Sequence, residues 1–146
     1  MKTKLTVEQK AAWIKALRTC ELPDGTKIQQ GTGALRRQPN ANDTPALCCL
    51  GVLCEVLDVP KVRIDEYCGE FMYGISSIQE APYNTKGHSS AVLPAYVAKA
   101  TGISGSGGFD SSLVTWNEDD SLAIMNDNGK SFSDIADVIE KVFDSI

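Results

Sequence analysis

Histidine is almost absent from this sequence, because His88 is the only one in 146 residues. A site that needs an imidazole base therefore has a single candidate. Five cysteines are present, but no two of them have the Cys-x-x-Cys spacing that is typical of structural zinc sites. We therefore expect no metal ion, and no motif of the sequence indicates another cofactor.

Long apolar runs are also missing. The longest nearly uninterrupted one, residues 47–57, is too short to cross a membrane. The basic first residues lead into a charged helix, which differs from the apolar segment of a signal peptide. An odd number of cysteines would leave one unpaired in a secreted protein, so free thiols in a reducing compartment fit better. We expect a cytoplasmic protein without a membrane partner.

Positive charge is scarce outside the N-terminal part of the chain. Residues 1–40 hold eight Lys or Arg and three Asp or Glu, whereas the remainder holds six and sixteen. Duplex nucleic acid is bound mainly through its phosphates by clustered basic side chains, so this acidic body argues against such a partner. The basic N-terminal section still allows a small anion to bind.

Two helix-start signals lie near the ends of the chain. Thr6 to Gln9 has the capping-box pattern and predicts a helix to about Arg18. Ser131, with an aspartate three residues later, predicts a second helix. Its apolar residues recur at three- and four-residue steps from residue 132 to Ile146. Both helices should therefore contribute to the core.

Residues 47–57 predict a third, buried helix whose bulky side chains cover almost its whole circumference, with Thr44 as its N-cap and Pro45 at its first position. Shorter elements are expected as strands at residues 26–29, 62–64 and 71–78, and as a helix at residues 93–100. Together they predict an α+β fold. We expect one compact domain, residues 1–146, with three main helices around a small antiparallel sheet.

Gly51 lies in the middle of the third predicted helix. Glycine costs a helix about 1 kcal/mol relative to alanine, so this position predicts a close approach by another backbone or by a ligand. A second glycine feature, the four glycines of residues 102–108, predicts a mobile loop or a ligand lid.

Four short motifs resemble a group of mostly uncharacterised bacteriophage-encoded proteins. They are Trp-Ile-x-Ala-Leu at 13–17, Gly-x-Gly-x-Leu at 31–35, Cys-Cys-Leu-Gly-Val at 48–52 and Leu-Asn-Asp-x-Gly-x-Ser-Phe at 125–132, where Met125 replaces the leucine. Small accessory phage proteins often counter bacterial defence systems, and one class of them sequesters nucleotide-derived messengers. By analogy, the resemblance implies a non-enzymatic anti-defence protein that acts in the host cytoplasm.

The segment from Gly31 to Arg37 is the first candidate for binding a phosphate. Backbone N–H groups near its two glycines and the guanidinium groups of Arg36 and Arg37 could hold an anion. No Gly-Lys-Ser/Thr follows, so the segment is not a P-loop. The alternative is a glycine-adapted turn with solvated arginines.

Further candidates for contacts with a nucleotide-like ligand are aromatic or polar: Tyr73, Trp116, Asn126 and Asp127. An aromatic ring could lie against the base, and Asn126 and Asp127 could face a base or ribose. Alternatively, these two residues belong to a tight turn that leads to the Ser131 cap. The hypothesis is sequestration of a small anionic nucleotide-like molecule, by a chain that could also form a homo-oligomer.

Two other functions stay open. Cys48 or Cys49 lies in the first turn of a predicted helix, where the dipole lowers a thiol pKa. His88 and then Asn126 or Asp127 follow in the Cys–His–Asn/Asp order of some cysteine hydrolases. The simpler interpretation is that these cysteines are buried core residues. The third possibility is a protein–protein inhibitor of a host factor.

Overall fold

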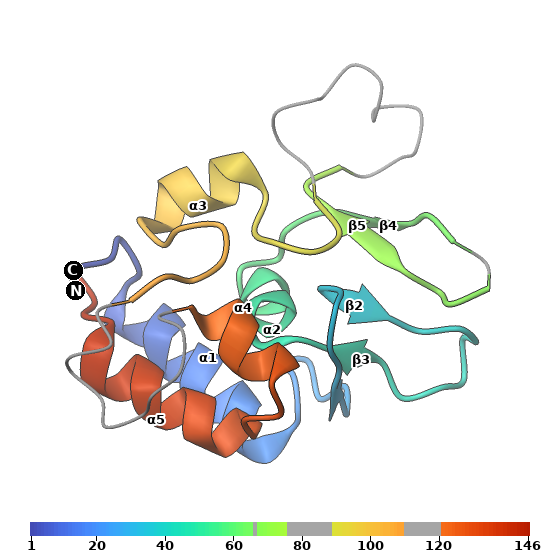
Figure 1. The fold of residues 1–146 in the computed structure, drawn as a ribbon, viewed down its shortest axis with the longest axis horizontal. Coiled ribbons are helices and arrows are strands. Elements are labelled where there is room, and N and C mark those ends of the chain that lie inside the picture. The colour runs from blue at the N-terminus through green and yellow to red at the C-terminus, as the bar shows by residue number, and fades with distance from the viewer. Residues whose placement is uncertain (66, 76–88, 110–120) are drawn as a thin grey trace.

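The structure, a computed structural model, describes residues 1–65, 67–75, 89–109 and 121–146 (Figure 1). His88 and Trp116 lie outside these residues. The described helices are α1 (Val7–Thr19), α2 (Cys49–Val56), α3 (Ala95–Thr101), α4 (Leu122–Asp127) and α5 (Phe132–Val142). The described strands are β1 (Gln29–Gln30), β2 (Arg36–Arg37), β3 (Ala46–Leu47), β4 (Lys61–Arg63) and β5 (Phe71–Tyr73).

Helices α1 and α5 begin where the capping signals predicted. At α1, the Gln9 N–H donates to Thr6 Oγ1 and the Thr6 N–H donates to Gln9 Oε1, each at 3.0 Å. At α5, the Asp134 N–H donates to Ser131 Oγ at 3.1 Å. The predicted apolar face of α5 is buried, except that Ile146 lies beyond the helix and is 78% exposed. That part of the prediction was wrong because the helix ends at Val142.

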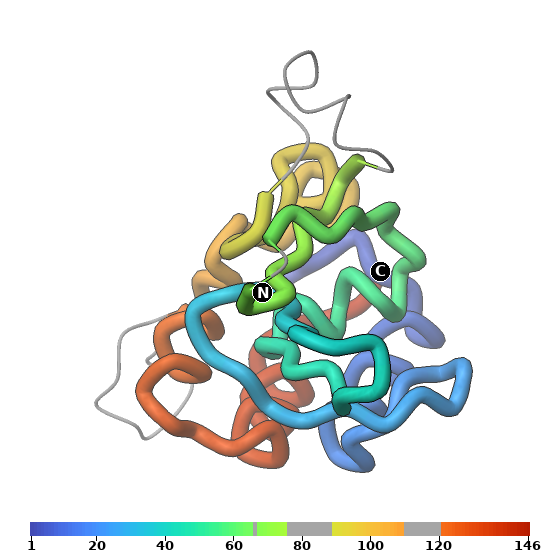
Figure 2. Tube along the Cα trace, turned by 90° about the vertical axis from the view of Figure 1, so that its right-hand side faces the viewer, coloured from blue at the N-terminus to red at the C-terminus, as the bar shows by residue number. Residues whose placement is uncertain are grey.

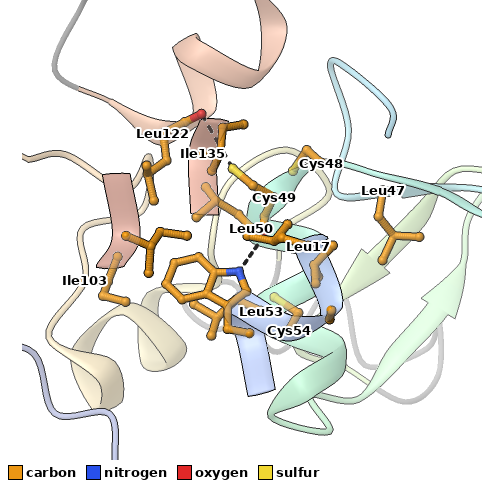
Figure 3. Close-up of a cluster of buried hydrophobic side chains, with 14 of the residues drawn as sticks. Leu17, Leu47, Cys48, Cys49, Leu50, Leu53, Cys54, Ile103, Leu122 and Ile135 are labelled. Atoms are coloured by element: carbon orange, nitrogen blue, oxygen red, sulfur yellow. Dashed lines mark hydrogen bonds between the residues drawn. The ribbon is translucent and has the colours of Figure 1, made fainter. Parts of the chain in front are cut away.

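Helices α1 and α5 lie side by side, and α2 packs against α1 (Figure 1). The indole of Trp13 on α1 is fully buried and donates to the Cys49 carbonyl of α2 at 3.0 Å. The thiol of Cys49 donates to the Leu122 carbonyl of α4 at 3.5 Å (Figure 3). The six residues from Cys49 to Cys54 are all buried, which confirms that α2 is a central core helix.

The start of α2 differs from the prediction. Thr44 and Pro45 are not its N-cap and first residue, because the helix begins at Cys49 with Cys48 as N-cap. Instead, Ala46 and Leu47 form β3, which pairs in parallel with β1 and antiparallel with β2. The local cap signal was overridden by this pairing, in which the Pro45 carbonyl accepts the Gln29 N–H at 3.0 Å.

Gly51 marks a close backbone contact, as predicted. A Cβ atom at this position would lie 2.8 Å from the carbonyl carbon of Leu35, and closer still to its oxygen. The same oxygen accepts the Cys48 N–H at 3.3 Å. The chain leading into β2 therefore lies directly on α2, and only glycine leaves room for it.

The strands confirm the α+β class, but the described ones form two sheets in place of a single antiparallel one. Strands β1, β3 and β2 make a mixed three-stranded sheet, and β4 pairs antiparallel with β5. An isolated bridge between Arg37 and Glu70 connects the two pieces. Figure 2 shows the segment between β1 and β3, light blue to teal, along the face turned to the viewer, next to the green β4–β5 segment.

Residues 102–108 are fastened to the start of α4. The backbone carbonyl of Ser106 accepts hydrogen bonds from the Ser121 hydroxyl at 2.8 Å and from the Ala123 N–H at 3.0 Å. Gly102 is the C-cap of α3, with φ of 72°. Among the described residues, no helix is long and apolar enough to cross a membrane.

Candidate functional site

Arg36 and Arg37 are neighbours on β2, and their side chains lie in different environments. The guanidinium of Arg36 forms an ion pair with Glu55 of α2, with 3.0 Å between Arg36 Nη1 and Glu55 Oε1. Both side chains are almost buried, at 11% and 10% exposure. The guanidinium also donates to Gln38 Oε1 at 3.0 Å and lies 4.9 Å from the centre of the Phe71 ring. Arg36 is therefore engaged inside the protein.

Glu55 holds a small polar network together. Lys61 Nζ lies 3.0 Å from Glu55 Oε1, and the Tyr73 hydroxyl donates to Glu55 Oε2 at 3.2 Å. The Tyr73 ring is fully buried, and burial, with the nearby carboxylate of Glu55, raises the pKa of its hydroxyl. Arg36 and Tyr73, both predicted ligand contacts, thus serve to join β2, β5 and α2.

Arg37 faces a groove of about 720 Å³. The other residues that line this Arg37 groove are Gln29, Pro39, Asp43, Thr44, Ala46 and Cys68. The guanidinium donates to the Thr32 carbonyl at 3.2 Å, whereas its buried Nε has no hydrogen-bond partner. Among the described residues, no acidic side chain forms an ion pair with Arg37. Its positive charge therefore lacks a carboxylate partner there.

Among the described residues that line the Arg37 groove, only Asp43 carries a carboxylate, and it is held by a local turn. Asp43 Oδ2 accepts the Asn40 N–H at 3.0 Å and the Asn40 side-chain amide at 3.2 Å. Gln29 in turn donates its amide to the Thr44 carbonyl at 3.0 Å. The groove thus combines one guanidinium that has no carboxylate partner in the described part of the chain, neutral polar groups and the Asp43 carboxylate, which accepts hydrogen bonds from Asn40. The Arg37 guanidinium is the group in it that suits an anion.

Asn126 is fully buried and has a structural role. Its Oδ1 accepts the Cys49 N–H at 3.2 Å and the Gln30 amide at 3.1 Å, and its Nδ2 donates to the Gly31 carbonyl at 2.6 Å. The exposed Asp127 accepts the Gly33 N–H at 3.0 Å. These two residues, at the end of α4, hold the glycine segment and the start of α2 in place. They do not line the Arg37 groove.

The thiols of α2 lie in an environment that disfavours ionisation. Burial raises the pKa of Cys48 to about 11, against the opposing hydrogen bonds from backbone N–H groups. Burial raises the pKa of the Cys49 thiol well above its ordinary value, and the pKa of Cys54 is raised for the same reason. Cys48 and Asp127 do line a common pocket, but it measures only about 160 Å³.

Two residues that sequence reasoning overlooked shape this region. Glu55 is the acidic partner of Arg36, and Cys68 lines the Arg37 groove. A signal for Glu55 was present, because a single carboxylate within an apolar helix needs a cationic partner when it is buried. No comparable signal pointed to Cys68, whose place depends on the pairing of β4 with β5.

The model of a family described as a domain of unknown function (DUF8296) matches residues 3–143. Neither a curated protein nor a solved structure matches the chain significantly.

Proposed function

We propose that this chain, which belongs to the family of domains of unknown function DUF8296, is a non-enzymatic protein that binds a small anionic, nucleotide-like molecule in the Arg37 groove. One observation carries the proposal: Arg37 faces a groove of about 720 Å³ and, among the described residues, has no acidic partner. Pockets for small ligands measure roughly 300–1,000 Å³. A guanidinium presents a planar fork of donors that matches a phosphate.

The role of Arg36 differs from the sequence prediction. Arg36 supports Arg37 indirectly, because its ion pair with Glu55 fixes β2 against α2. Phosphate would contact Arg37, and Arg36 would keep the strand in position. Arg37→Ala is therefore the variant that tests binding, whereas Arg36→Ala would disturb the fold.

The biological setting is part of the same proposal. The resemblance of four short motifs to phage-encoded proteins is the support for sequestration of a nucleotide-derived messenger in the cytoplasm of an infected host. A cysteine hydrolase is supported less well, because a nucleophilic thiolate needs a lowered pKa and burial raises the pKa of Cys48 to about 11. Inhibition of a host protein remains the other alternative. Mass spectrometry of small molecules released from the purified protein separates sequestration of a ligand from inhibition of a host protein.

The direct test is a thermal-shift screen of the full chain with pyrophosphate and with cyclic and ADP-ribose-derived nucleotides. A ligand at 100 times its Kd stabilises the folded state by about 2.7 kcal/mol, which is a shift of several degrees. We expect at least one compound to raise the Tm of the wild type and to have no effect on Arg37→Ala. Arg37→Lys should retain part of the effect, because lysine keeps the charge without the fork of donors.

Arg18→Ala is the matched control for this screen. It removes the same charge from the surface of α1, where Arg18 pairs with Asp137 and Glu140 of α5. Ligand shifts should therefore be retained in this variant. A screen without any shift in the wild type, or with shifts that persist in Arg37→Ala, would refute the proposal.

A further inference from the structure

Tyr67 is the most exposed large aromatic side chain of the described residues. It is 95% exposed, whereas Tyr73 is fully buried and Tyr96 is 44% exposed. Placing an aromatic ring in water leaves its apolar surface unburied, and this ring contributes no packing to the fold. Such a ring, next to a groove, is a suitable surface for a ligand.

The turn that carries Tyr67 is attached to the wall of the Arg37 groove. The Gln38 N–H, one residue after Arg37, donates to the Gly69 carbonyl at 2.8 Å. A Cβ at Gly69 would lie 2.5 Å from the nitrogen of Pro39, so the two backbones are in direct contact. Cys68, between Tyr67 and Gly69, lines the groove itself.

The backbone of Tyr67 is also held in place, because its N–H donates to Asp65 Oδ1 at 2.8 Å. Residues 67 and 68 form a turn, so the alternation of side chains along a strand does not separate them. Consecutive Cα atoms are about 3.8 Å apart. The backbone of Tyr67 is thus one residue from Cys68, which lines the groove, and it is fixed to the groove wall.

We propose that Tyr67 stacks on the base of the ligand while Arg37 holds its phosphate, so that the ligand class is a nucleotide and not a simple phosphate or sugar phosphate. This inference rests on the proposed function. An inorganic phosphate would fill little of the roughly 720 Å³ groove, and it would leave the exposed ring without a contact. Stacking alone would allow the site to accept different bases, because every base has a π-face.

The test is isothermal titration calorimetry of the full chain with ribose 5-phosphate and with the four ribonucleoside 5′-monophosphates. These ligands share the sugar and phosphate and differ in the base. Base–aromatic stacking strengthens binding by about 5- to 150-fold. We expect the nucleotide with the highest affinity to bind at least about fivefold more tightly than ribose 5-phosphate. Tyr67→Ala should abolish this difference, and Tyr67→Phe should retain it.

Tyr96→Ala is the control, because it removes a half-exposed tyrosine from α3 and should leave the affinities unchanged. If nucleotides and ribose 5-phosphate bind equally and lose affinity only in Arg37→Ala, stacking by Tyr67 is refuted and the anion site stands. If Tyr67→Ala and Tyr96→Ala weaken binding alike, stacking is refuted as well. If neither these ligands nor any compound of the thermal-shift screen binds in an Arg37-dependent way, the proposed function fails, and the inference about Tyr67 fails with it.

Discussion

Replacing Gly51 by alanine tests the contact between α2 and the chain before β2. Helix propensity alone predicts that this change stabilises the protein by about 1 kcal/mol. The packing predicts the opposite sign, because the new Cβ would lie 2.8 Å from the carbonyl carbon of Leu35. The neighbouring backbone would have to move by more than half an ångström before this distance reaches an ordinary 3.4 Å.

The size of the effect follows from three contributions. Overpacking against backbone, which cannot rotate away as a side chain does, costs up to about 3 kcal/mol. The shift also weakens the hydrogen bond from the Cys48 N–H to Leu35, which contributes about 1 kcal/mol. Helix propensity offsets about 1 kcal/mol. Gly51→Ala should therefore lower the free energy of unfolding by up to about 3 kcal/mol and the Tm by up to about 10 °C.

The assay is urea and thermal unfolding followed by circular dichroism, with Gly105→Ala as the matched control. A Cβ at Gly105 would meet its nearest neighbour at 3.8 Å, an ordinary contact. This variant should be neutral or slightly stabilised, by up to about 1 kcal/mol. A Gly51→Ala protein that is as stable as the wild type, or more stable, would refute the close contact. Gly51→Leu should be more severe than Gly51→Ala.

Three further predictions concern the buried polar network and the thiols. Arg36→Ala should lower the free energy of unfolding by about 3 kcal/mol, because it leaves Glu55 buried with fewer partners. Arg18→Ala on the surface should lower it by less than about 1 kcal/mol. Equal losses of the two variants in urea unfolding would contradict the burial of the Arg36–Glu55 ion pair. Iodoacetamide at neutral pH should label the native protein at its two exposed thiols only, Cys20 and Cys68, and mass spectrometry should find all five labelled after denaturation. Asp65 accepts a hydrogen bond from the Cys68 thiol, and its carboxylate raises the pKa of that thiol. Asp65→Asn should therefore increase the rate at which iodoacetamide labels Cys68. An unchanged rate would contradict the hydrogen bond between these two side chains.

Features with local causes were predictable from the sequence. The caps at Thr6 and Ser131 depend on groups three residues away, and both were found where the pattern indicated. Gly51 indicated a close approach because glycine is unfavourable inside a helix. What lay against Gly51 could not be predicted, since the approach of Leu35 depends on how the strands pair.

The site was harder to predict because its partners are distant in the sequence. Neighbouring arginines look alike in a sequence, but only Arg36 meets Glu55, and this follows from the packing of β2 on α2. Thr44 and Pro45 misled for a similar reason, because their cap pattern is local and strand pairing decides the outcome. Tyr67 is exposed because a turn between β4 and β5 carries it outward, which no periodicity reveals.

The pairing of α1 with α5 has a consequence for how the protein is made. A ribosome adds about 5–20 residues per second, so the roughly 110 residues between these two helices take on the order of 5–20 s to synthesise. During that interval Trp13 and Leu17, both fully buried in the finished protein, have no α5 to pack against. The core therefore closes only after synthesis of α5. Until then the growing chain exposes apolar surface of the kind that chaperones bind.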